Sequence, residues 1–196
     1  MTAEPRPLRA DAERNRRRVL DAARDVFARR GLEAGVDEIA RCAGVGVGTL
    51  YRRFPTKQDL LAAVIEDGFV RLMAALEETA AIEDPWASYA AAAHALGDAI
   101  ARDRGFHEAV QAAKHELVDF DALRAQLLEA VGAPLSRAQA AGVVRGDLTA
   151  QDLLSLCAVA ARLPEWRLRE EPAIWRRYLS VVLDGTRPEG ATPLPR

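Results

Sequence analysis

Apolar residues recur at spacings of three and four along most of the chain, the period of an amphipathic α-helix, and strand-like alternation of useful length is missing. Leu20, Ala23 and Phe27 share one such stripe, and Gly31 follows them as a residue suited to ending a helix. The pattern predicts an all-α chain of about nine helices, at residues 11–30, 36–43, 47–54, 56–81, 85–102, 105–119, 121–142, 149–163 and 172–185.

Three of the predicted helices start at a recognisable cap. Thr56 with Asp59, and Thr149 with Asp152, have the spacing of an approximate capping box. Asp84 precedes Pro85, which suits the first position of a helix. Residues 186–196 hold three prolines and show no apolar period, so we expect them to form a disordered tail.

Composition removes several classes of protein. With 196 residues, 49% of them hydrophobic, the chain fits one compact domain or two small ones, and the disordered and collagen-like classes are excluded. No run of eighteen apolar residues occurs, and residues 1–9 lack the apolar stretch of a secretory signal. Cys42 and Cys157 lie far apart without the spacing of metal ligands. These features predict a cytoplasmic protein with free thiols and no membrane partner.

The net charge of −2 hides an uneven distribution. Residues 1–57 carry 13 basic against 8 acidic side chains, whereas residues 58–196 carry 14 against 21. This basic first third indicates that it meets a polyanion. The arginines that precede or open the first helix, Arg14 and Arg18 among them, are expected to reach a DNA minor groove or phosphates, and a solvated polar face is the alternative.

Residues 36–54 have the pattern of a helix-turn-helix, with two short helices separated by a glycine-bearing turn. Ala40 and Ala43 are small where the helices cross closely, and Gly44 suits the left-handed backbone of the turn. Val45 and Leu50 fill the seam between the helices. A nucleotide-binding reading of the glycines fails because no strand precedes them and the third glycine of that motif is missing.

The second of these helices is expected to expose a surface for DNA. Gly48 lies inside it at a cost of roughly 1 kcal/mol against alanine, which suits close approach to a groove or phosphate. Val47, Gly48 and Arg52 occupy the face where bases would be read, and an arginine there can address guanine O6 and N7.

The stretch AGVGVGTLYRRFPTKQDLL is similar to the pattern A-G-V-S-x-G-T-L-Y-x-x-F-x-x-K-x-x-L of the TetR family of bacterial transcription regulators. The resemblance covers residues 14–66 in detail. It implies phosphate contacts from Tyr51 and Lys57, and a DNA-backbone contact from Thr49. Gly46 and Val36 depart from the family's usual serine and threonine, so weaker anchoring is expected there. The expected DNA-binding residues are Val47, Gly48, Thr49, Tyr51, Arg52, Arg53, Thr56, Lys57, Arg14 and Arg18.

For residues 82–196 the resemblance extends only to architecture, and it implies a small-molecule site between helices. Candidates are the aromatic and polar residues on the chain's apolar helices, although plain core packing accounts for most of them equally well. They are Phe69, Met73, Trp86, Tyr89, His94, Phe106, His115, Phe120, Cys157 and Trp166.

The resemblance also implies a homodimer formed by the last two helices, which carry apolar stripes suited to a four-helix bundle. The stripe residues are Leu153, Leu156, Ala160, Leu163, Trp175, Tyr178, Leu179 and Val182. The alternative is that these stripes pack only within one chain. His107 and His115 lack a third ligand for zinc, and no nucleophile with a neighbouring base is recognisable, so metal, cofactor and catalytic residues are not predicted.

Together these features predict a basic arm at residues 1–10, a DNA-binding domain at 11–57, a ligand-binding and dimerisation domain at 58–185, and the tail. The expected function is a repressor that binds a pseudo-palindromic DNA operator as a homodimer and is released by a small-molecule effector. Two alternatives remain open: a helical small-molecule-binding protein or enzyme without DNA binding, and a regulator controlled by a protein partner.

Overall fold

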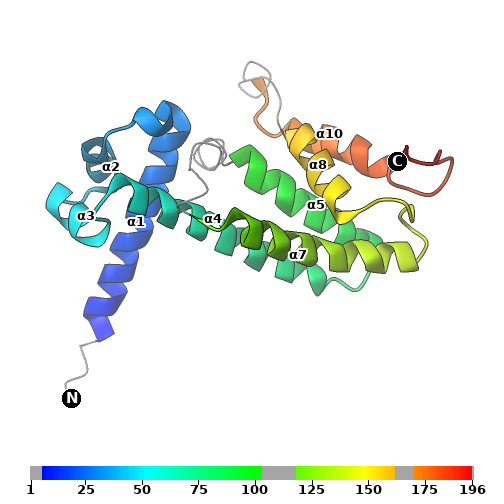
Figure 1. Ribbon diagram of the computed structural model, residues 1–196, viewed down its shortest axis with the longest axis horizontal. Coiled ribbons are helices and arrows are strands. Elements are labelled where there is room, and N and C mark those ends of the chain that lie inside the picture. The colour runs from blue at the N-terminus through cyan, green and yellow to red at the C-terminus, as the bar shows by residue number, and fades with distance from the viewer. Residues whose placement is uncertain (1–5, 103–117, 162–169, 196) are drawn as a thin grey trace. The chain divides into compact units, whose positions relative to one another are not determined.

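The computed structural model describes residues 6–102, 118–161 and 170–195, and over these ranges the secondary structure is helical, without a strand (Figure 1). The all-α prediction is therefore confirmed. Of the predicted helix at 105–119, residues 105–117 lie outside the described residues, and residues 118 and 119 are not helical. The helices are α1 (Arg6–Arg30), η1 (Gly31–Glu33, a single 3₁₀ turn), α2 (Val36–Ala43), α3 (Val47–Arg53), α4 (Lys57–Ala80), α5 (Pro85–Arg102), α7 (Phe120–Ala140), α8 (Ala150–Ala161) and α10 (Trp175–Asp184).

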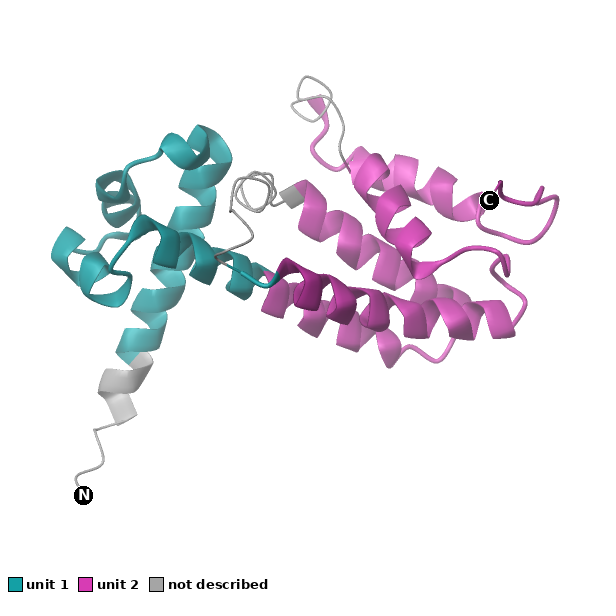
Figure 2. Ribbon diagram, viewed as in Figure 1, with its two compact units in different colours: residues 1–68, 103–119 teal, residues 69–102, 120–196 magenta. Residues whose placement is uncertain are grey.

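The chain divides into two compact units (Figure 2). The N-terminal unit comprises residues 1–68 and 103–119, and the C-terminal unit comprises residues 69–102 and 120–196. The predicted boundary at residue 57 falls at the start of α4, whereas the division by packing falls within this helix. None of the described helices combines the length and apolar character needed to cross a membrane.

The N-terminal unit is organised around the apolar stripe of α1. Leu20, Ala23 and Phe27 are buried at the spacing that the sequence predicts, together with Val19 and Val26 beside them. Burial of these side chains against α2 supplies the hydrophobic stabilisation that a helix of eight residues cannot obtain alone.

Side-chain caps fix the starts of three helices, as predicted. At α4 the Asp59 carboxylate accepts hydrogen bonds from the Thr56 amide at 2.9 Å and from its hydroxyl at 2.8 Å, and the Asp59 amide donates to Thr56 Oγ1 at 3.1 Å. Thr149 and Asp152 repeat this capping box before α8. Asp84 Oδ1 accepts from the Ala87 amide at 2.6 Å at the start of α5.

Two predicted helix starts were wrong. α1 begins at Arg6, so the expected arm of residues 1–10 is helical from residue 6 onwards, because Pro7 is tolerated in a first helical turn. α10 begins at Trp175 and not at Pro172, which lies in a turn. That turn is closed by hydrogen bonds of the tighter i to i+3 type, from the Ile174 amide to Glu171 O and from the Arg176 amide to Ala173 O, both at 3.0 Å.

The C-terminal unit packs α5, α7, α8 and α10 around one apolar core. Leu96, Leu153 and Leu179 are among its fully buried members. Gly97 of α5 is required by close packing, since a methyl group there would overlap the indole ring of Trp175. The glycine therefore allows α10 to approach α5.

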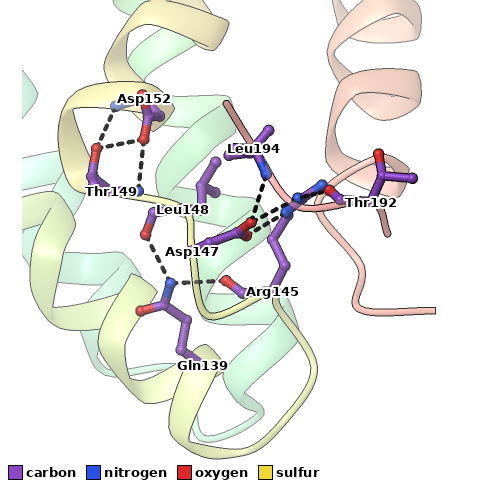
Figure 3. Close-up of polar contacts among 8 residues, drawn as sticks. All are labelled: Gln139, Arg145, Asp147, Leu148, Thr149, Asp152, Thr192 and Leu194. Carbon is purple, nitrogen blue, oxygen red and sulfur yellow. Dashed lines mark hydrogen bonds and ion pairs between the residues drawn. The ribbon is translucent and has the colours of Figure 1, made fainter. Parts of the chain in front are cut away.

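The segment after α10 is bound to the C-terminal unit, which contradicts the expectation of a disordered tail at residues 186–196 (Figure 3). The Arg145 amide donates to Thr186 O at 2.9 Å, and the Leu194 amide donates to Asp147 Oδ2 at 3.0 Å. The Arg145 guanidinium bonds both Asp147 and the Thr192 carbonyl. These partners lie more than 40 residues away in sequence, which is why a pattern confined to the segment missed them.

Candidate nucleic-acid interface

The turn between α2 and α3 has the geometry that the sequence predicts. Gly44 adopts a left-handed conformation with φ of +64°, which a residue with a side chain rarely takes. Its amide donates to Arg41 O at 3.2 Å, and the Val45 amide donates to Ala40 O at 3.0 Å. This pair of bonds is a Schellman motif, which ends α2 sharply and sends the chain into α3 after two residues.

α3 is held by one buried side chain and exposes the others. Leu50 is 1% exposed, whereas Val47 is 37% and Tyr51 is 44% exposed. The remaining residues predicted to face DNA on this helix are also exposed, namely Gly48, Thr49, Arg52 and Arg53. A methyl group on Gly48 would meet no atom within 4 Å, so packing within the chain does not require this glycine.

A groove of about 460 Å³ lies between α1 and α3. Its floor is apolar and includes Val19, Leu50 and Phe54. Arg52 and Arg53 line it from α3, and within the described residues neither has a hydrogen bond or an ion pair. Two guanidinium groups are therefore available to an anion beside the exposed face of α3.

Thr56 and Lys57, both predicted to bind DNA, make hydrogen bonds within the protein at the start of α4. The Thr56 amide and hydroxyl are both occupied by Asp59, so neither is free for a phosphate. The half-buried Lys57 directs its ammonium group to the carbonyl oxygen of Leu32, within the 3₁₀ turn η1 that follows α1. An ammonium group has three donors, so this bond leaves two for other acceptors.

Several of the arginines of α1 are engaged within the protein. Arg18 donates from Nη2 to Ala43 O at 2.7 Å and so contacts the end of α2, not solvent alone. Arg14 pairs with Asp11 on its own helix. Arg24 contacts the Asp67 carboxylate at 3.1 Å, and Arg16 lies 3.9 Å from it. The basic charge of the first 57 residues is therefore partly used to join helices.

The expected effector-binding residues occupy different environments. Tyr89 and Cys157 are fully buried in the core, and burial raises the pKa of each to about 12. Both therefore stay neutral at physiological pH. Half-buried positions are taken by Phe69, Met73, Trp86, His94 and Phe120. Phe106, His115 and Trp166 lie outside the described residues.

The expected dimerisation residues are mostly core residues of a single chain. Leu153, Ala160, Trp175 and Leu179 are buried in the C-terminal unit, and Leu163 lies outside the described residues. Leu156 and Val182 are half-buried, and only Tyr178 is exposed, at 41%. The predicted stripes therefore combine residues of the buried face of each helix with residues of the opposite face.

Two exposed valines on these helices were missed. Val159 of α8 is 72% exposed and Val181 of α10 is 67% exposed. The signal lay in the polar stripe of α8, where Gln151 and Ser155 are followed at the same four-residue spacing by a valine. A single exposed apolar residue needs no explanation, but exposed apolar residues on two helices that pack together can form a surface for a contact outside the chain.

Metal and disulfide chemistry receive no support from the part of the chain that the structure describes. Cys42 is exposed and Cys157 is buried, and both are free thiols, as predicted. No group of three or more histidine, cysteine, aspartate or glutamate side chains gathers there in a form that would hold a metal ion.

Comparisons with known families match both parts of the chain. Residues 19–64 match the model of bacterial regulatory proteins of the tetR family. Residues 84–188 match the C-terminal domain of SbtR-like transcriptional regulators. An HTH-type transcriptional regulator of Staphylococcus aureus is 42% identical over 60 residues, which are 30% of this chain and 32% of that protein. The chain thus matches about a third of the length of this curated relative.

Solved structures match nearly the whole chain. A TetR transcriptional regulator of Streptomyces coelicolor is 32% identical with a TM-score of 0.68, over 88% of this chain and 98% of that one. A TetR regulatory protein of Mycobacterium vanbaalenii is 36% identical with a TM-score of 0.69, over 92% and 99%. The regulator FadR of Bacillus subtilis, solved in complex with stearoyl-CoA, is 19% identical with a TM-score of 0.68, over 87% and 97%, and so shares the fold.

Proposed function

The chain belongs to the TetR family of bacterial regulatory proteins, and we propose that it is a DNA-binding transcription regulator, a repressor released from its operator by a small-molecule effector. The observation that carries this proposal is the exposed face of α3. α3 directly follows a sharp Schellman turn, and the side chains of this face are exposed and do not pack in the core.

The α3 surface suits the major groove of DNA. Arg52 offers a guanidinium to base edges, and Tyr51 offers a hydroxyl to the phosphate backbone. Gly48 adds no side chain, so the helix backbone can approach the DNA closely. Thr49, Val47 and Arg53 complete the face.

We assign the dimer interface to the exposed outer faces of α8 and α10. Val159, Tyr178 and Val181 are apolar or amphipathic side chains exposed in the single chain, and a second copy would cover them. A two-fold dimer presents two α3 helices to half-sites about 34–36 Å apart on DNA, so the proposed operator is pseudo-palindromic.

The C-terminal unit is the proposed effector-binding part. Its half-buried aromatic residues and His94 supply apolar contact and hydrogen-bonding capacity, which small-molecule sites combine. The fold relative FadR, with its bound stearoyl-CoA, is consistent with a ligand in a body of this architecture. Control by a protein partner is the alternative, and it predicts that no small molecule raises the melting temperature.

Family membership also favours regulation over catalysis. We therefore propose that the chain is not an enzyme, and that it acts where the chromosome is, in the cytoplasm. A helical ligand-binding protein without DNA binding is the remaining alternative, and it is separated from the proposal by the DNA experiment below.

Selection of bound duplexes from a random-sequence DNA pool tests the proposal. The purified chain should enrich a pseudo-palindromic sequence, and that duplex should bind at least about 1,000-fold more tightly than a random duplex of equal length. Arg52→Ala should change which sequences are enriched. Equal affinity for the enriched and random duplexes would rule out sequence-specific regulation.

A further inference from the structure

Arg18 of α1 binds the C-terminal end of α2. Its Nη2 donates to Ala43 O at 2.7 Å and to Gly44 O at 3.1 Å, and its Nε donates to Ala43 O at 3.2 Å. These carbonyls lie where the α2 backbone turns and where the helix dipole places partial negative charge. A planar guanidinium can bond both oxygens at once, which the single nitrogen of lysine does less well.

The Arg18 contact coincides with the left-handed residue of the turn. A methyl group on Gly44 would lie 3.1 Å from Arg18 Nη2, which is tighter than most such contacts. Gly44 therefore has two roles in the turn. It adopts the left-handed φ of +64°, and it leaves space for the Arg18 guanidinium. Two independent features of the turn depend on this one position.

The α2–α3 turn has a strong influence on the direction of α3. Only Val45 and Gly46 separate Gly44 from the first residue of α3. α3 has seven residues, one buried anchor in Leu50, and no side-chain cap at Gly46. So short a helix does not hold its own position, and its direction is set by the turn that precedes it and by the helix on which it packs.

We propose that Arg18 is a positioning residue of the DNA interface, which fixes the orientation of α3 through the carbonyls of Ala43 and Gly44 and does not act as a phosphate ligand. The inference rests on the proposed function. α1 is itself joined to α4 by the ion pair of Arg24 with Asp67 within the N-terminal unit. Arg18 therefore connects the α2–α3 turn to a helix whose position is fixed by another contact. Its Nε and Nη2 are occupied by the carbonyls, so a phosphate would have only Nη1.

Two substitutions separate positioning from charge. Arg18→Gln removes the charge, and Arg18→Lys keeps the charge but loses the fork that spans two carbonyls. If Arg18 positions α3, both variants should bind the enriched duplex at least about tenfold more weakly. Affinity for a random duplex should stay within about twofold, because non-specific binding does not require precise placement of α3. Arg29→Gln, which removes the same charge at the far end of α1, is the matched control.

The salt dependence gives the opposing outcome. A positioning role predicts an unchanged slope of log affinity against log salt in Arg18→Gln. A phosphate contact predicts a slope flatter by about one unit, with binding restored by Arg18→Lys. That second result would overturn the proposal. Equal losses for the enriched and random duplexes would also overturn it, since they would show a smaller folded fraction and not a misplaced helix.

Hydrogen exchange examines the turn without DNA. The amides of Gly44 and Val45 should exchange faster in Arg18→Gln than in the wild type, whereas the amide of Leu60 in α4 should not change. Unchanged exchange at Gly44 and Val45 would refute the holding role even if the chain binds no specific duplex. Absence of an enriched duplex with the wild-type chain would instead refute the proposed function.

Discussion

The guanidinium of Arg187 lies over the indole ring of Trp86, with Cζ 3.7 Å from the ring centroid. A cation over an indole face is attracted by the negative charge of the ring's π-system. The contact joins the segment after α10 to the start of α5, 101 positions earlier in sequence. Together with the Arg145 and Asp147 bonds, it anchors this segment at two places.

Removing the Arg187 guanidinium should lower the free energy of unfolding by about 0.5–1 kcal/mol. Urea unfolding of Arg187→Ala, Trp86→Ala and the double variant measures the coupling between the two side chains. Glu189→Ala, an exposed change in the same segment, is the control and should leave the stability unchanged. Strictly additive effects of the two single substitutions would contradict an interaction between Arg187 and Trp86.

The second anchor should depend on pH through Asp147. Hydrogen bonds from the Arg145 guanidinium and the Leu194 amide hold the pKa of Asp147 well below its ordinary value. The unfolded chain therefore binds the proton more readily, and the stabilisation from Asp147 is present above about pH 4 and lost as pH falls below it. The difference in unfolding free energy between the wild type and Asp147→Asn should accordingly shrink from pH 6 to pH 3.

Asp121→Asn is the control for the Asp147 experiment, because Asp121 is an exposed carboxylate on α7 that lies apart from this segment. Its difference from the wild type should stay small across the same range. A constant difference between the wild type and Asp147→Asn would mean that the carboxylate charge is not what holds Arg145 and Leu194.

Local interactions explain why much of the fold was predictable. A capping box such as Thr56 with Asp59 joins residues three apart, so its sequence spacing contains the whole geometry. The left-handed turn at Gly44 is similarly local, since it needs only a glycine after a short apolar helix. The exposed face of α3 was predictable from the same kind of local sequence pattern.

Long-range contacts explain what the sequence did not reveal. The sequence does not predict the intramolecular partners of Arg18, because nothing near it in sequence shows that they lie 25 and 26 positions away. The contact of Leu194 with Asp147 spans 47 positions. Apolar periodicity also does not state which of two faces a helix buries, and so Leu179 was grouped with residues exposed on the outer face of α10.

The proposed dimer interface predicts different outcomes for exposed and buried residues. Val181→Asp should weaken dimerisation more than about tenfold, because a carboxylate would be desolvated at the interface. Sedimentation velocity over a range of concentrations measures this change. Val70→Asp introduces the same charge at a valine of similar exposure on α4, and it should leave the dimer intact.

Leu179→Ala should behave in the opposite way, because Leu179 is fully buried in the core of one chain. It should lower the unfolding free energy by about 2–5 kcal/mol. A dimer unaffected by both Val181→Asp and Val159→Asp would remove the outer faces of α8 and α10 from the interface.

Lys57 contacts the Leu32 carbonyl and is also proposed to contact a DNA phosphate, and a salt titration of DNA binding separates these two roles. Its ammonium group bonds Leu32 O, and two donors remain for a phosphate. Lys57→Met should lower stability by about 1 kcal/mol through the lost bond to the carbonyl. It should also weaken DNA binding nearly uniformly across sequences and flatten the salt slope by about one unit. A smaller folded fraction alone cannot flatten the slope, because it lowers affinity by the same factor at every salt concentration.

Arg30→Met removes an equal charge from the last turn of α1 and is the control for the Lys57 titration. Long-range attraction alone would make the two variants equal, whereas a direct phosphate contact flattens the slope only for Lys57→Met. If Lys57→Met lost stability and kept the wild-type slope, Lys57 would act only on the Leu32 carbonyl. The anion contact at the start of α4 would then fall to its backbone amides, whose partial positive charge persists in the variant.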